Sequence, residues 1–170
     1  MNLKEFIHDI PDFPKPGIIF KDISPLLRNP EATRETVLKL SKGLDTKKID
    51  QVVGIESRGF LLGILLAQHL QVGFTLMRKP DKLPGKVIKQ PYALEYGEDA
   101  IEIQENAIKP GQKVILHDDV LATGGTAAAA QQLIQSCGAE VIEFNFLMEL
   151  DFLKGREKLG KTPIKSLLNY

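Results

Sequence analysis

One stretch of sequence, Val114–Thr126, constrains the fold of this chain more than any other feature. It begins with the apolar run Val114-Ile115-Leu116, continues through His117 and two adjacent acids, and ends in Ala-Thr-Gly-Gly-Thr. An apolar run that leads into a small-residue turn and then into helical periodicity is typical of a strand–turn–helix unit. Such units build parallel sheets, in which ligands bind beyond the carboxyl ends of the strands.

Strand and helix patterns alternate along much of the remaining sequence, which predicts an α/β fold with a mostly parallel sheet flanked by helices. The expected strands are residues 49–55, 73–78, 113–116 and 141–147. The expected helices are residues 2–10, a segment that starts near Pro30 and ends before Gly43, residues 59–71 and residues 126–136. With 43% hydrophobic residues, a chain of 170 residues suits one compact domain, residues 1–170.

The segment from Lys79 to Asp99 is the long exception to this alternation. It contains three prolines, two glycines and mixed charges, which predicts an excursion with limited regular structure. Long loops inside compact domains are uncommon and are often functional lids. We therefore expect a mobile loop here.

Composition excludes several classes of function. Lysine plus arginine balance aspartate plus glutamate at 22 each, so the net charge gives no support to nucleic-acid binding. No apolar run approaches the length needed to cross a bilayer, and the first ten residues carry charges unlike a signal peptide. A single cysteine, Cys137, suits a reducing compartment. The chain is expected in the cytoplasm, with no membrane partner.

The chemistry of Val114–Thr126 indicates a phosphorylated ligand. Gly124 and Gly125 let the backbone approach a phosphate at a helix N-terminus, where free N–H groups and a partial positive charge favour anions. Asp118 and Asp119 would repel that phosphate, so they make sense only if the ligand also carries hydroxyls or a divalent cation. A diol, a phosphate and a metal-chelating group together describe a phosphoribosyl pyrophosphate. The spacing fits neither a Walker A loop nor a GxGxxG fingerprint.

From about residue 10 to residue 168, the chain resembles the type I phosphoribosyltransferases, and among them those that act on adenine. The resemblance begins with residues 114–126 and extends to several separated motifs. These motifs are Phe13–Leu27, Gly54–Phe60, Arg78–Gly85, Leu94–Gly97 and Leu153–Leu159, the last of which resembles the family's C-terminal helix.

The resemblance implies a site for 5-phosphoribosyl-1-pyrophosphate. Asp118 and Asp119 would hold the ribose hydroxyls, and the residues from Ala122 to Thr126 would hold the 5-phosphate. The implied phosphate residues are Ala122, Thr123, Gly124, Gly125 and Thr126; the implied pyrophosphate residues are Glu56, Ser57, Arg58, Arg78, Lys79 and Lys82. The peptide bond between Glu56 and Ser57 is expected to be cis, as is common in the family. Magnesium would arrive chelated by the pyrophosphate, with no protein-built metal site.

The resemblance also implies a base-binding hood at the N-terminus and a homodimer. The backbone of Ile19 and Lys21 would read the edge of adenine, while Phe20 and Val120 would cover its faces. Glu95, in the mobile loop, would manage the proton on the base. Lys21 stands where the family usually has arginine, so a bidentate guanidinium contact is lost there.

Alternatives remain at this point. The chain could be a phosphoribosyltransferase for guanine, hypoxanthine or xanthine, although the Phe13–Gly17 segment favours adenine. It could also be a regulator that senses the ribosyl donor, which would predict an added DNA-binding module or basic patch. His117 could hydrogen-bond to the acids that follow it or face the packing layer, and we favour packing. His8 and His69 are expected to be structural residues in helices.

Overall fold

The structure of the chain is a computed structural model, which describes residues 1–93 and 98–170. The chain divides into two compact units, Met1–Lys39 and Leu40–Tyr170, and each is described by itself. The expectation of one domain over residues 1–170 stays a prediction.

The first unit contains a short hairpin and the first helices. Its elements are a 3₁₀ turn η1 (Leu3–Phe6), β1 (His8–Pro11), β2 (Ile19–Asp22), α1 (Ser24–Arg28) and α2 (Pro30–Ser41), which continues two residues into the second unit. The helix predicted near Pro30 is confirmed. The helix predicted over residues 2–10 is wrong, because only one turn forms before His8–Pro11 pairs antiparallel with β2. His8 accordingly lies in a strand, whereas His69 lies in a helix as expected.

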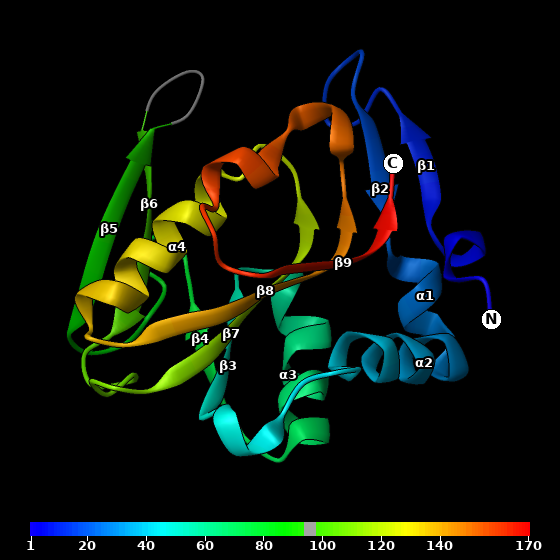
Figure 1. Ribbon diagram of the computed structural model, residues 1–170. Helices are drawn as coiled ribbons and strands as arrows, with labels where there is room; N and C mark the ends of the chain where they lie inside the picture. Colours follow the sequence, from blue (N-terminus) through cyan, green and yellow to red (C-terminus); the bar gives the residue numbers. More distant parts are fainter. Residues whose placement is uncertain (94–97) are drawn as a thin grey trace. The chain divides into compact units, whose positions relative to one another are not determined.

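The second unit is built on a five-stranded parallel sheet in the order β4-β3-β7-β8-β9 (Figure 1). This confirms the predicted α/β class. The sheet strands are β3 (Gln51–Ile55), β4 (Gly73–Met77), β7 (Lys113–Leu121), β8 (Glu140–Glu149) and β9 (Ile164–Asn169). The helical elements are η2 (Thr46–Lys48), α3 (Gly59–Leu70), α4 (Gly125–Ser136) and the 3₁₀ turns η3 (Asp151–Leu153) and η4 (Gly155–Lys158).

The order of the strands changes direction between β3 and β7. The chain leaves β3 through α3 toward one edge of the sheet, and leaves β7 through α4 toward the other. Because such crossovers are right-handed, α3 and α4 cover opposite faces. Open α/β sheets bind their ligands at this kind of switch point, outside the carboxyl ends of the strands. The fold therefore directs attention to the ends of β3 and β7.

Strand β7 is longer than predicted, and the extra residues lie at the switch point. Pairing with β3 stops at Gly54 opposite His117, whereas pairing with β8 continues to Leu121 opposite Glu149. The strand therefore passes through both acids, which the sequence placed after its end. From Asp118 onward one edge of β7 is not paired with β3.

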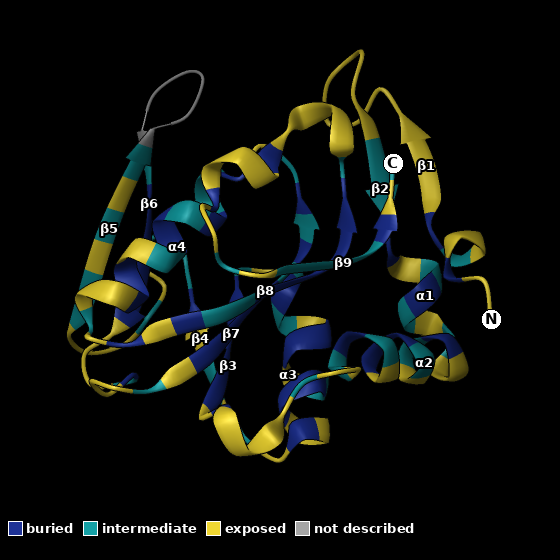
Figure 2. Cartoon of the chain, in the orientation of Figure 1, coloured by how far each residue is buried: buried dark blue, intermediate teal, exposed yellow. Residues whose placement is uncertain are grey.

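One core cluster of the second unit joins this sheet to α4 and to the pair of β5 (Val87–Ala93) and β6 (Glu98–Gln104). Phe144 and Phe146 stack at 6.3 Å between ring centroids, and both are fully buried. Figure 2 shows buried residues along the inner strands and exposed ones on the outer sides of the helices. Ala127, Ala130 and Leu133 of α4 belong to the same buried cluster, so the helix is fixed to the sheet from its first turn.

The segment predicted to be a loop with limited regular structure contains a β-hairpin, so that prediction is wrong. Strands β5 (Val87–Ala93) and β6 (Glu98–Gln104) pair antiparallel. Their register brings Ile88 opposite Ile103, and Ile101 and Ile103 are buried in the core cluster. The prolines and lysines concealed this pattern in the sequence, because the apolar positions that anchor the hairpin lie mostly on its second strand.

The C-terminal segment also differs from expectation. Residues 153–159 form no α-helix: η3 and η4 meet at Lys154, whose φ of 53° interrupts helical geometry. Strand β9 was not predicted, and it completes the sheet beside β8.

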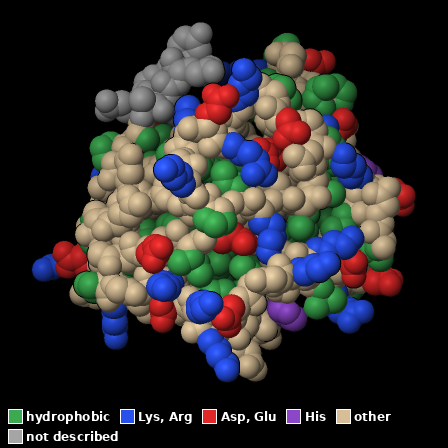
Figure 3. Space-filling model, viewed as in Figure 1, with side chains coloured by type: hydrophobic (Ala, Val, Ile, Leu, Met, Phe, Trp, Pro, Cys, Tyr) green, Lys and Arg blue, Asp and Glu red, His purple; other side chains and the backbone are tan. Residues whose placement is uncertain are grey.

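Charged side chains of both signs are interspersed on the face shown in Figure 3, in keeping with a net charge of zero. Within the described part of the chain, every helix is too short or too polar to cross a membrane.

His117 faces the packing layer, as favoured from the sequence. It is fully buried, and its Nδ1 lies 3.0 Å from Oδ1 of Asn145 in β8 rather than against the acids. On its other side, a Cβ added to Gly63 of α3 would lie 3.3 Å from its Cδ2. Burial disfavours the imidazolium and lowers the pKa of His117 to about 4, with the Asn145 contact opposing that shift.

We predict that His117 makes the fold acid-sensitive. Between pH 6.5 and 4 the unfolded chain takes up a proton at this residue and the folded chain does not, so stability falls as pH falls, by about 3 kcal/mol. His117→Leu removes this proton uptake. Urea unfolding at pH 7 and pH 4 should show a smaller loss for the variant than for the wild type. Equal losses would contradict this account.

Candidate active site

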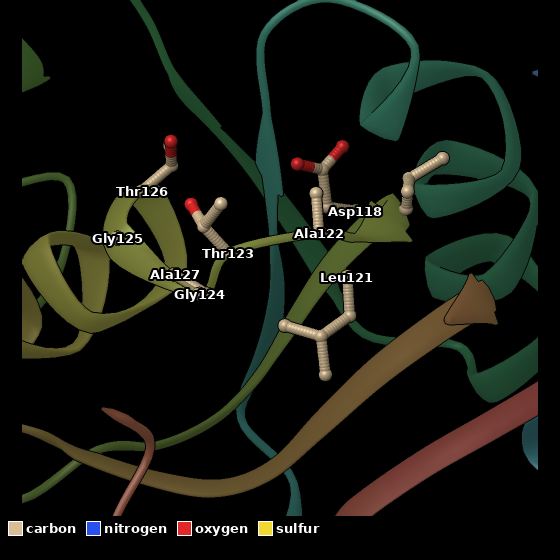
Figure 4. A pocket seen from close by; sticks show the side chains of 9 residues that line it. Asp118, Leu121, Ala122, Thr123, Gly124, Gly125, Thr126 and Ala127 are labelled. Atoms are coloured by element: carbon tan, nitrogen blue, oxygen red, sulfur yellow. The ribbon is translucent and has the colours of Figure 1, made fainter. Parts of the chain in front are cut away.

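The turn between β7 and α4 forms a small polar cavity of about 70 Å³, lined by the Asp118–Ala127 segment. Figure 4 shows the hydroxyls of Thr123 and Thr126 and the Asp118 carboxylate on one side of the turn, with Leu121 pointing away. The hydroxyl and carboxylate groups that line the cavity suit a polar ligand. The residues predicted to hold a phosphate, 122–126, all line it.

The N-terminus of α4 is well suited to that anion. Gly124 precedes the helix with φ 78°, and no side chain of the described residues caps the first turn, which also lacks an acidic residue. The first N–H groups of a helix have no partner inside the helix, and the macrodipole adds partial positive charge. The turn therefore presents several backbone donors to the cavity.

Two carboxylates lie beside these donors. Asp118 is half-buried and accepts a hydrogen bond from the Asp119 amide at 2.8 Å, while Asp119 is only 4% exposed. Burial raises the pKa of Asp118 well above its ordinary value, and the charge of Asp119 raises it further. Burial also raises the pKa of Asp119, and the Arg58 guanidinium partly offsets that effect. The pair therefore favours a ligand that supplies hydroxyl donors or a cation.

The junction of β3 and α3 lies against this pair. Arg58 precedes α3, and its Nη2 lies 2.8 Å from Oδ2 of Asp119. A Cβ added to Gly59 would lie 2.9 Å from Oδ1 of Asp118, so the glycine allows the helix to approach β7 this closely. The bond between Glu56 and Ser57 is cis, as predicted. The Glu56–Arg58 turn and the acid pair thus meet at the switch point.

Glu56 forms ion pairs with two of the cations predicted to bind a pyrophosphate, Arg78 and Lys82. Its carboxylate accepts hydrogen bonds from Arg78 at 3.2 Å, from the Lys79 amide at 2.8 Å and from Lys82 Nζ at 2.8 Å. Burial raises the pKa of Glu56, but the bonds from Lys82, Arg78 and the Lys79 amide outweigh it and lower the pKa to about 2. Glu56 is therefore ionised, and its side chain competes with an anion for Arg78 and Lys82.

Another predicted cation, Lys79, belongs to a second cluster of polar side chains that the sequence did not reveal. Its Nζ donates to Asp99 and to the Tyr92 hydroxyl at 2.9 Å. Tyr92 donates to Asp99 at 3.1 Å and accepts from Thr126 of the phosphate turn at 3.4 Å. The hydroxyl of Tyr92 thus links the β5–β6 hairpin to the α4 N-terminus. A period-two reading of Val87–Ala93 would have placed Tyr92 with Ile88 on the packed face.

Three of the four predicted base-binding residues, Ile19, Phe20 and Lys21, lie in the hairpin of the first unit. Phe20 packs edge-on against Phe13, with ring centroids 5.2 Å apart. Lys21 forms an ion pair of 2.6 Å with Asp9 across the hairpin and is largely buried. The hairpin exposes several large apolar side chains, namely those of Ile10, Phe13, Ile18 and Ile19. The side chain of Lys21 is therefore paired within the hairpin, which also exposes apolar side chains.

Glu95, the predicted proton-handling residue, lies outside the described residues. Val120 lines the cavity of the phosphate turn. Among the described residues, no cluster of three or more His, Cys, Asp or Glu side chains is arranged to hold a metal ion. Any divalent cation at Asp118 and Asp119 would need most of its ligands from elsewhere.

Comparison with known proteins gives consistent matches. The family model described as "Phosphoribosyl transferase domain" matches residues 23–166. Adenine phosphoribosyltransferase of Christiangramia forsetii is 55% identical over 170 residues, which cover 100% of this chain and 99% of that protein. The crystal structure of adenine phosphoribosyltransferase from Rhodothermus marinus has a TM-score of 0.95 at 48% identity, covering 99% of this chain and 96% of that chain.

A more distant structure was solved with ligands. The Trypanosoma brucei adenine phosphoribosyl transferase, in complex with AMP, pyrophosphate and ribose-5-phosphate, has a TM-score of 0.88 at 31% identity. The match covers 98% of this chain and 78% of that chain.

The geometry at Asp118 predicts a stability gain from a neutral substitute. Because its pKa is raised in the folded state, the charged form destabilises the fold above that pKa, and Asp118→Asn removes this penalty. For a chain of this length, each 1 kcal/mol of added stability corresponds to roughly 2–4 °C in Tm. Tm should therefore rise in the variant at pH 7.5, with the gain shrinking toward pH 4.

The matched control is Glu140→Gln, which neutralises an exposed carboxylate at the opposite end of the sheet. It should leave Tm within about 1 °C at both pH values. A lower Tm for Asp118→Asn than for the wild type at pH 7.5 would contradict the assignment of a buried, disfavoured charge.

Proposed function

This chain belongs to the phosphoribosyltransferase family, and we propose that it transfers the 5-phosphoribosyl group from 5-phosphoribosyl-1-pyrophosphate to adenine. The products are AMP and pyrophosphate, and the reaction is a step of purine salvage. The enzyme is a pentosyltransferase. The observation that carries this conclusion is the 55% identity to an adenine phosphoribosyltransferase over the full length of both chains.

The 5-phosphate of the donor binds at the N-terminus of α4. The amides of the turn and the hydroxyls of Thr123 and Thr126 donate to its oxygens, as at other phosphate sites on helix N-termini. Asp118 and Asp119 accept hydrogen bonds from the ribose hydroxyls. Arg58 favours the ionised form of Asp119 for that purpose, since its guanidinium lies 2.8 Å away. The lining of the cavity by residues 122–126 and the uncapped helix support this placement.

Magnesium fits this arrangement as a companion of the donor. Mg²⁺ prefers oxygen ligands and usually keeps several waters, binding through one or two carboxylates and substrate phosphates. Asp118 and Asp119 are the carboxylates that could complete such a shell, while the pyrophosphate supplies the chelating oxygens. When bound, the ion neutralises charge on the leaving group.

Arg78, Lys79 and Lys82 bind the pyrophosphate. In the structure their charges are balanced by Glu56 and Asp99, so the arriving donor competes with these carboxylates for the same cations. These ion pairs hold the three cations in place before the donor binds. Pyrophosphate then departs from the anomeric carbon through a transition state with oxocarbenium character while a ring nitrogen of adenine attacks. The enzyme contributes positioning, neutralisation of the leaving group and exclusion of water.

Adenine is neutral, so it is recognised by hydrogen bonds and stacking. The backbone of Ile19 and Lys21 reads its edge, while Phe20 and Val120 cover its faces. The commitment of the Lys21 side chain to Asp9 supports backbone rather than side-chain reading. Glu95, which lies outside the described residues, handles the proton on the base.

We place the active enzyme in the cytoplasm as a homodimer. Leu61 and Ile64 stand three residues apart on α3 and are exposed, as is Leu76 on β4, the edge strand that α3 contacts. Exposed apolar side chains grouped in this way are typical of association surfaces. Sedimentation of the wild-type chain should give twice the monomer mass of 18.9 kDa; a single monomeric species at micromolar concentration would contradict the dimer.

We predict selective use of adenine. With the ribosyl donor and magnesium, the chain should form AMP and should use hypoxanthine and guanine at least about 100-fold less efficiently, since a base with the wrong polar edge leaves hydrogen-bonding groups unpaired. Turnover of hypoxanthine or guanine at rates near that of adenine would refute the assignment. No turnover of any base, with donor binding intact, would favour a regulator that senses the donor.

Two matched variants locate the base-recognition groups. Phe20→Ala should raise the Michaelis constant for adenine about tenfold and leave that for the donor unchanged, because it removes a stacking face. Lys21→Ala should change the preference for adenine over guanine by much less than tenfold. Loss of discrimination in Lys21→Ala with little effect in Phe20→Ala would place recognition on the lysine side chain instead.

A further inference from the structure

The phosphate turn rests on a second turn of the chain. A Cβ added to Gly155, the first residue of η4, would lie 2.2 Å from the carbonyl oxygen of Ala122 and 3.1 Å from the amide nitrogen of Gly124. In the reverse direction, a Cβ on Gly124 would lie 2.3 Å from the carbonyl oxygen of Gly155. Two glycine backbones therefore touch, with no side chain between them. A displacement of Gly155 must displace the turn that carries the phosphate donors.

Gly155 is held in place by its neighbour Arg156. The guanidinium Nε lies 2.6 Å and 2.8 Å from the two carboxylate oxygens of Glu149, and Nη2 lies 2.6 Å from one of them. Glu149 is 3% exposed and also accepts from the Ser166 hydroxyl of β9 at 2.8 Å. Charge-assisted pairs of this kind are strong and geometrically specific, because the planar guanidinium matches the carboxylate.

Glu149 in turn belongs to the rigid sheet. It is the last residue of β8, paired with Leu121 of β7 on one side and Asn169 of β9 on the other. The amide of Leu150, the next residue, donates to the Leu121 carbonyl at 2.9 Å. A continuous path of contacts thus runs from the sheet through Glu149 and Arg156 to Gly155 and the phosphate turn.

We propose that Glu149, Arg156 and Gly155 are positioning residues for the 5-phosphate of the ribosyl donor. Their task is to fix the backbone amides of Ala122–Thr126 where the phosphate oxygens bind. The proposal rests on the proposed function, which places the 5-phosphate at this turn. Hydrogen bonds from backbone amides cannot be re-aimed by a side-chain rotation, so their direction depends on what supports the backbone. Misplacement of a binding group by about 1 Å can cost as much as 100-fold in rate.

The affinities for ribose 5-phosphate and for pyrophosphate test the proposal. Ribose 5-phosphate would bind at the phosphate turn, whereas pyrophosphate would bind at Arg78, Lys79 and Lys82. Arg156→Ala should weaken ribose 5-phosphate by at least about tenfold, and Gly155→Ala by more, because the new Cβ must displace Ala122 or Gly124. Pyrophosphate affinity should change by less than about twofold in both variants. Arg156→Lys keeps the positive charge but loses the planar guanidinium. Its affinity for ribose 5-phosphate should therefore lie between those of Arg156→Ala and the wild type.

Lys158→Ala is the matched control, because it removes an exposed cation from the same short turn. It should leave both affinities unchanged. Calorimetric titration well below the Tm of each variant separates positioning from loss of fold. Should Arg156→Ala fail to fold, Arg156→Lys and Gly155→Ala carry the test.

Each other outcome is decisive. If the wild-type chain does not bind ribose 5-phosphate, the proposed phosphate site itself is refuted, and with it the positioning role that rests on that site. Folded Gly155 and Arg156 variants that bind ribose 5-phosphate like the wild type overturn the positioning role. Equal losses for both ligands also overturn it, since they indicate a general loosening of the site.

Discussion

The uncapped N-terminus of α4 is the feature on which the rest of the site depends. A chain without net positive charge can hold a multiply charged ligand only through local donors, and the first amides of a helix supply them. Those donors are useful only if they are fixed. α4 is anchored by buried alanines along its first turns, and the turn before it rests on the Gly155 backbone. The parallel sheet places this helix end beside the β3–α3 junction, where the acid pair and Arg58 meet.

Three carboxylates of the site form ion pairs with its cations. Asp119 holds Arg58, Glu56 holds Arg78 and Lys82, and Asp99 holds Lys79. Each of these cations is a predicted ligand of the leaving group, so a site that binds a highly charged donor contains its own balancing anions. This explains how an enzyme for such a donor can have a net charge of zero. The raised pKa of Asp118 shows that its charge is disfavoured in the folded chain.

The sequence predicted the parts of this molecule that follow from local patterns. The strands near residues 51–55 and 113–116 and the helices that follow them were evident, because apolar runs and small-residue turns are local signals. The β1 strand and the β5–β6 hairpin were missed, because each strand is defined by a partner elsewhere in the chain. The contacts of Tyr92, Asp99 and Arg156 were missed for the same reason, because they join segments that lie apart in the sequence. The roles of Glu95 and of the base-binding hood stay predictions.

The central claim is that the backbone amides between β7 and α4 hold the 5-phosphate. Amide chemical shifts of the ¹⁵N-labelled chain, recorded during titration with ribose 5-phosphate, test it directly. The account predicts that the largest shifts fall on residues 123–127, with smaller changes at Asp118 and Asp119 and almost none at the far end of the sheet, near Gln51 and Glu140. Shifts concentrated at Arg78, Lys79 and Lys82, with residues 123–127 unmoved, would contradict it.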